Sequence, residues 1–120
     1  RMAPSIVFGL LTDSARPTHR QYCESWEIVL WDEGINVWHQ TLPDGRVLWE
    51  LISYAKFPLQ PHARYTLAVR REGNSLHIEA AGHAFGLLVP DLPPACHVGI
   101  TGCEGINRFY DFRLQSGKKG

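Results

Sequence analysis

The amino-acid sequence predicts an all-β protein, an antiparallel two-sheet β-sandwich in a single domain. Short runs in which apolar and polar residues alternate recur along the 120 residues, and this period of two is typical of half-buried strands. Gly, Pro, Asp and Asn separate the runs, as turns between strands require. No window of helical length carries apolar residues at helical spacing behind a capping residue. Many short strands, each with one face for packing, favour two sheets packed face to face.

The strands follow one another between turns of recognisable chemistry. Pro43-Asp44-Gly45 predicts a tight turn, because Pro fixes φ and Gly accepts a positive φ. Glu72-Gly73-Asn74 predicts a second hairpin turn. Segments 58–61 and 90–94 carry prolines that cannot sit inside a ladder, so they are expected to cross between the sheets, and the polar segment 12–21 is expected to form a long loop. The strands expected are 5–11, 25–31, 36–42, 46–54, 64–71, 75–81, 84–89, 97–101 and 108–114.

Alternation within the strands assigns side chains to faces. In the hairpin around Gly73, the side chains expected on the packed side are those of Tyr65, Leu67, Val69, Leu76, Ile78 and Ala80. In the strand 36–42, one face carries Asn36, Trp38 and Gln40, and the other carries Val37, His39 and Thr41. In the strand 46–54, Glu50 and Tyr54 are expected to share a face, opposite Val47, Trp49 and Leu51.

The size and the net charge of the chain limit the classes of partner that we expect. A chain of 13.6 kDa is one domain, over residues 1–120, with residues 1–4 and 115–120 expected to be flexible ends. Its 12 basic and 12 acidic residues cancel, so no positive field attracts nucleic acid. No apolar stretch approaches the roughly 18 residues of a membrane-spanning helix. We therefore expect neither nucleic acid nor a membrane as a partner.

The three cysteines, Cys23, Cys96 and Cys103, cannot all pair within one chain. None forms a Cys-x-x-Cys motif, and no cysteine and histidine spacing matches a zinc site, so no metal is expected. Buried thiols in a reducing compartment fit this pattern, and a Cys96–Cys103 disulfide is the alternative for a secreted protein. No signal peptide is recognisable, and the compartment is left open.

The second half of the chain resembles a known family. The run from Tyr65 to Ile78 is similar to a hairpin of concanavalin A-like domains, and residues 92–94, 97–100 and 109–114 resemble the end of that fold. The similarity is good over residues 64–114 and vague before them. By this resemblance the chain is identified as a shortened member of the concanavalin A-like lectin and glucanase superfamily, whose jelly-roll domains include those of the laminin-G type. The resemblance implies a jelly-roll topology, and the missing edge strands imply that a homodimer can form through edges.

The tryptophans suggest what such a domain binds. All four, Trp26, Trp31, Trp38 and Trp49, fall within neighbouring expected strands. An indole ring flanked by amides suits a sugar, because the apolar face of a pyranose stacks on the ring while amides bond the hydroxyls. The first hypothesis is therefore a non-catalytic, lectin-like carbohydrate-binding module that takes a glycan or another small-molecule ligand. The residues expected to bind the ligand are Trp38, Asn36, Gln40, Glu50 and Trp31.

A second hypothesis is a small enzyme or enzyme fragment, hydrolase-like or lyase-like, acting on glycans or another small molecule. Glycoside hydrolysis needs two carboxylates, about 5–5.5 Å apart for retention or about 6.5–9.5 Å apart for inversion. Glu27 and Glu50, on neighbouring expected strands, form the pair to test. A third hypothesis is an oligomerisation module whose exposed aromatic residues pack against a partner.

A short motif recurs as Glu33-Gly34-Ile35-Asn36 and Glu104-Gly105-Ile106-Asn107. Two hairpin turns that use the same turn residues explain it. The alternative places both loops at one rim, where their carboxylates and amides converge on a ligand or a calcium ion, although calcium needs about six to eight oxygen ligands. No cofactor is expected, and none of the six histidines stands out as a metal ligand.

Overall fold

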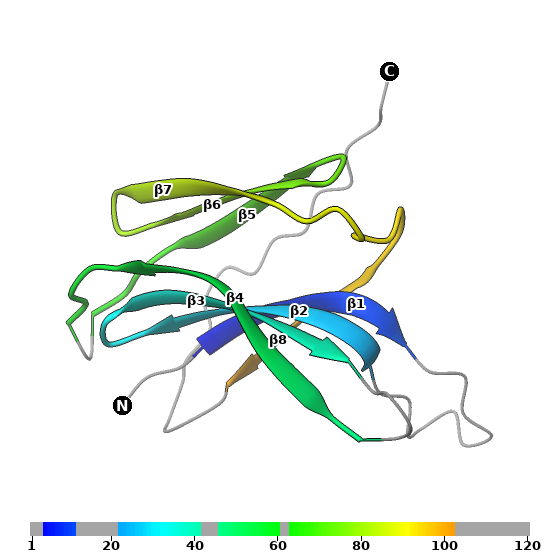
Figure 1. Ribbon diagram of the computed structural model, residues 1–120. Coiled ribbons are helices and arrows are strands. Elements are labelled where there is room, and N and C mark those ends of the chain that lie inside the picture. The colour runs from blue at the N-terminus through cyan, green and yellow to red at the C-terminus, as the bar shows by residue number, and fades with distance from the viewer. Residues whose placement is uncertain (1–3, 12–21, 42–45, 61–62, 103–120) are drawn as a thin grey trace.

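The computed structural model describes residues 4–11, 22–41, 46–60 and 63–102, and every regular element within these ranges is a β-strand (Figure 1). The strands form two antiparallel sheets, as the sequence predicts. The large sheet has five strands in the order β4-β3-β2-β1-β8, and the small sheet has three in the order β5-β6-β7. The strands are β1 (Pro4–Leu11), β2 (Tyr22–Trp31), β3 (Gly34–Thr41), β4 (Leu48–Lys56), β5 (Leu67–Glu72), β6 (Ser75–Ala80), β7 (His83–Leu88) and β8 (His97–Gly102).

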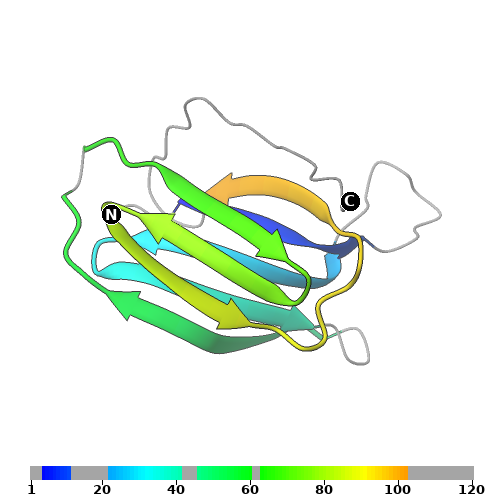
Figure 2. The same ribbon diagram turned by 90° about the horizontal axis from the view of Figure 1, so that it is seen from above.

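The chain builds the two layers one after the other. β1 to β4 form a meander in the large sheet, and β5 to β7 then form a meander in the small sheet. The chain returns to the large sheet with β8, which pairs with β1 (Figure 2). Of the prolines expected between sheets, Pro58 follows β4 and Pro90, Pro93 and Pro94 follow β7, while Pro61 lies outside the described residues. The expected ninth strand, residues 108–114, and the expected loop 12–21 lie outside the described residues.

The core lies between the sheets and is centred on Trp26. Its side chain is 1% exposed and stacks between the rings of Phe8 and His39, at centroid distances of 5.9 and 4.7 Å. The small sheet contributes Leu76, Ile78 and Ala80, which are buried, while His77 and Glu79 on the same strand are exposed. The faces predicted for this strand from alternation are therefore confirmed.

Strand β2 departs from the expected pattern of one packed and one wet face. Its outward-facing residues Ser25, Glu27 and Val29 are 0–7% exposed, almost as buried as the core residues between them. β2 is the middle strand of the large sheet, so neighbours cover it on both edges. On the same outer face, the described side chains of β3 are half-buried and those of β4 are exposed.

Tight turns join the strands where the sequence places glycine. Gly73 has a φ of 59°, and Glu72 pairs with Ser75 across it, which confirms the predicted hairpin turn. The turn between β6 and β7 uses Ala81 and Gly82, both at positive φ. The predicted Pro43-Asp44-Gly45 turn lies outside the described residues. No helix able to cross a membrane is found in the part of the chain that the structure describes.

Candidate functional site

Three aromatic or apolar side chains of β4 and three side chains of β3 share the outer face of the large sheet. Cross-strand partners in an antiparallel pair point to the same side of the sheet. The partner pairs here are Asn36 with Tyr54, Trp38 with Leu51, and Gln40 with Trp49. We call this set of six residues the aromatic face.

A β-bulge in β4 determines which residues reach the aromatic face. Val37 pairs with Ser53 and Trp38 pairs with Leu51, so Ile52 is the extra residue between the two pairs. An unbroken register would have put Ile52 opposite Trp38 and Glu50 opposite Gln40. The bulge moves Leu51 and Trp49 into these places instead.

Two sequence-based expectations fail because of this bulge. Tyr54 does not share a face with Glu50, and it lies on the side of Trp49 and Leu51. Glu50 pairs with His39, whose ring stacks on Trp26 at the core side of the sheet. The structure therefore does not place Glu50 beside Trp38, Asn36 and Gln40.

The aromatic face is accessible, most of all along β4. Tyr54 is 59% exposed, Trp49 49% and Leu51 42%. Trp38, Asn36 and Gln40 are half-buried. β4 has β3 as its strand partner among the described residues, so it forms an edge of the large sheet. A ligand can therefore reach the rings both from above the sheet and from its side.

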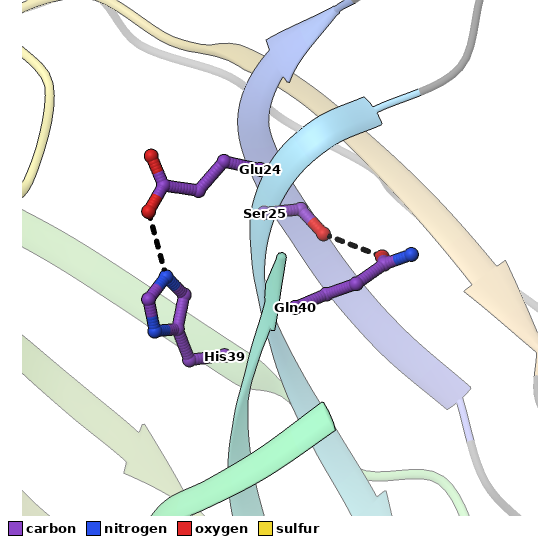
Figure 3. A network of polar contacts seen from close by, with 4 residues as sticks. All are labelled: Glu24, Ser25, His39 and Gln40. Atoms are coloured by element: carbon purple, nitrogen blue, oxygen red, sulfur yellow. Dashed lines mark hydrogen bonds and ion pairs between the residues drawn. The ribbon is translucent and has the colours of Figure 1, made fainter. Parts of the chain in front are cut away.

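Polar contacts fix the orientation of side chains on both sides of β3 (Figure 3). On the outer side, the Ser25 hydroxyl donates a hydrogen bond of 2.9 Å to Gln40 Oε1, and the Gln40 amide nitrogen lies on the far side of that oxygen from Ser25. On the core side, His39 Nε2 donates to Glu24 Oε2 at 2.8 Å. Gln40 is therefore held by its acceptor, with its donor group directed elsewhere.

Trp31 lies at the end of the same outer face. It pairs with Gly34, and alternation along β2 puts it on the side of Val29, which pairs with Asn36. Its side chain is half-buried. Of the five residues expected to bind a ligand, four thus share a face, and Glu50 stands apart.

The two carboxylates expected to act as a catalytic pair are not assembled. Glu27 pairs with Trp38 and points to the outer side, whereas Glu50 points to the other side of the sheet. Glu27 is 7% exposed. Among the outward-facing positions of the described strands in the large sheet, Glu27 is the sole carboxylate.

The turn that carries the first copy of the repeated motif anchors the end of β4. The carbonyl of Glu33 accepts a hydrogen bond of 3.1 Å from the amide of Phe57, and that of Asp32 accepts one of 3.1 Å from Leu59. Phe57 and Leu59 are buried in the core. The second copy, residues 104–107, lies outside the described residues, and the described ones hold no cluster of three or more His, Cys, Asp or Glu side chains that could bind a metal.

Cys96 is a half-buried free thiol beside the core. Burial raises the pKa of this thiol, and the nearby Arg71 guanidinium, whose Nη1 lies 3.9 Å from Sγ, opposes the rise. Arg71 is held in place by the carbonyls of Gly73 and Leu92. Because the nucleophile is the thiolate, a raised pKa makes Cys96 a poor one at neutral pH.

We expect Cys96 in the folded protein to react with iodoacetamide more slowly than it does in the unfolded chain at pH 7. The raised pKa leaves less thiolate at that pH, and the difference should shrink as the pH rises through the folded-state value. Peptide mass mapping of the Cys96 peptide after timed alkylation, with and without denaturant, measures both rates. An equal rate in the folded protein would contradict the raised pKa, and a faster rate would show that the thiol is activated.

Comparison with known proteins does not identify the chain, because no family model, no curated protein and no solved structure matches it.

Proposed function

We propose that the aromatic face binds carbohydrate without cleaving it. The observation that carries the proposal is the register of β3 and β4, which gathers two indole rings, a phenol ring and two amides on one accessible side of the large sheet. Aromatic rings offer the flat apolar surface on which the C–H face of a sugar stacks, and amides offer both donors and acceptors to its hydroxyls.

The spacing of the rings favours an oligosaccharide over a single sugar. Trp49 is the diagonal cross-strand neighbour of Trp38, and such neighbours lie about 7–8 Å apart. Tyr54 extends the row in the other direction along β4. One sugar ring covers one of these platforms, so affinity is expected to rise when the ligand is long enough to reach a second.

The charges around the aromatic face favour a neutral glycan. Glu27 lies almost buried beside Trp38, and Lys56 Nζ lies 6.0 Å from the centre of the Tyr54 ring. No cluster of like charges forms on the face among the described residues, and the chain as a whole carries no net charge. Stacking and hydrogen bonding, and not ion pairing, then supply the affinity.

The finer part of the proposal is a concanavalin A-like jelly-roll topology. The path of the chain supports it, because the chain leaves the large sheet after β4, builds the small sheet and returns beside β1. An enzymatic role through Glu27 and Glu50 has no such support, since these residues lie on opposite sides of the sheet.

Isothermal titration calorimetry with a panel of soluble neutral oligosaccharides tests the proposal. We expect saturable binding, and a loss of roughly tenfold or more in affinity for Trp38→Ala, because stacking surface worth about 1.4 kcal/mol is removed. Trp49→Ala should lower the affinity for long oligosaccharides more than the affinity for short ones.

Two variants control this experiment. Glu50→Gln changes a residue on the other side of β4, and His77→Ala changes an exposed residue on the outer side of the small sheet. Both should retain the wild-type affinity. Absence of binding across the panel by the folded protein, or binding that Trp38→Ala leaves intact, would refute the proposal.

A further inference from the structure

The first half of β4 and the two residues before it form an exposed apolar edge. Val47 is 50% exposed, Leu48 56% and Trp49 49%. Trp49 points to the aromatic face and Leu48 to the opposite side, so apolar side chains are exposed on both sides of one edge strand. An edge of this kind is a template for another strand, because its unpaired backbone groups add hydrogen bonds to the apolar contact.

The sequence of this edge is complementary to itself. Residues 46–50 read Arg-Val-Leu-Trp-Glu, with a positive charge at one end, a negative charge at the other and apolar residues between them. When two such strands pair antiparallel about Leu48, Arg46 of each copy lies opposite Glu50 of the other. Val47 then lies opposite Trp49, and the two Leu48 side chains meet at the centre.

We propose that two copies of this chain pair through residues 46–50, with a two-fold axis at Leu48. The contact is isologous, because the same residues contribute from each copy. It joins the two large sheets edge to edge and places the two aromatic faces next to each other across the axis. Opposite charges facing each other across a strand pair stabilise it, and like charges destabilise it.

A second copy fits this edge better than an unrelated strand does, because the edge itself supplies the matching charges. Arg46 and Glu50 are both exposed. β7, one of the two edge strands of the small sheet, gives a comparison within the same molecule. It runs from His83 to Leu88 without a single acidic residue and shows one large exposed apolar side chain, Leu88 at 67%. Self-pairing of β7 would therefore gain no opposite-charge contacts.

Charge reversal tests the pairing and its register together. Sedimentation velocity from micromolar to millimolar protein should show wild-type monomers giving way to dimers. Arg46→Glu and Glu50→Arg each place like charges opposite one another twice in the dimer, so each should raise the dimer dissociation constant by roughly tenfold or more. Both sites are exposed, so the variants are expected to fold, which circular dichroism checks.

Restoration of the dimer is the decisive result. The double variant Arg46→Glu/Glu50→Arg recreates opposite charges and should dimerise like the wild type. An equimolar mixture of the two single variants should also form dimers, because the acidic edge of one matches the basic edge of the other. Glu79→Arg, an outward-facing change on β6 with the same effect on net charge as Glu50→Arg, should leave dimerisation unchanged.

Three results would overturn the proposal: a wild-type chain that stays monomeric at the highest concentration, single reversals that still dimerise, or a double variant that does not recover. The proposal does not rest on sugar binding. Sedimentation is measured without any sugar, so it can fail or succeed independently of the titrations described above.

Discussion

Trp26→Ala is expected to lower the free energy of unfolding by about 3–5 kcal/mol, the usual cost of deleting a large core aromatic residue. The indole is 1% exposed and contacts the rings of Phe8 and His39 on either side. Its loss leaves a cavity between the sheets and removes two stacked contacts. Urea denaturation followed by far-UV circular dichroism measures the change.

Trp49→Ala is the matched control for this experiment, because it deletes the same side chain at a site that is 49% exposed. We expect it to cost less than about 1 kcal/mol. A stability loss at Trp49 as large as that at Trp26 would contradict the assignment of the core.

Gly34→Ala is expected to destabilise the fold by at least about 3 kcal/mol, or to prevent folding. Gly34 has a φ of 129°, a conformation that L residues rarely adopt, and a Cβ atom there would lie 2.0 Å from the carbonyl oxygen of Ala55. The obstacle is backbone, so no side-chain rotation relieves it. Relief would require β3 and β4 to separate where they begin to pair.

Substitutions at two other glycines distinguish the cost of backbone strain from the cost of a steric clash. Gly73 has a φ of 59° but has open space around its Cβ direction, so Gly73→Ala should cost about 1 kcal/mol through strain alone. Gly86 has a backbone conformation open to other residues, and its nearest neighbouring atom lies 3.8 Å away. Gly86→Ala should therefore change stability by about 0.5 kcal/mol or less. Equal effects at Gly34 and Gly73 would contradict the close approach to Ala55.

Alternation predicted much of this fold from sequence. Eight of the nine expected strands occur within one to three residues of their predicted ends, and the ninth lies outside the described residues. The exposed and buried positions of β6 follow the pattern of its sequence. This success has a local cause, since the alternating residues of a strand and the turn residues that end it lie close together in the sequence.

The candidate site was predicted only in part, because one feature of it is not local. The aromatic face depends on the bulge at Ile52, and no glycine or proline in β4 marks that position. Strict alternation along the strand therefore assigned Glu50 to the face that carries Trp38, where it does not lie. It also did not identify Trp49 and Tyr54 as residues of that face. Alternation likewise does not predict that β2 is buried on both of its sides.

The most direct test of the central claim is to follow the four indole N–H signals in a nuclear magnetic resonance titration with the tightest-binding oligosaccharide. We predict that the signals of Trp38 and Trp49 shift in a saturable way while that of Trp26, buried on the core side, stays in place. If the protein is saturated with sugar while the Trp38 and Trp49 signals stay unchanged, or if the shifts are confined to the small sheet, carbohydrate binding at the aromatic face is contradicted.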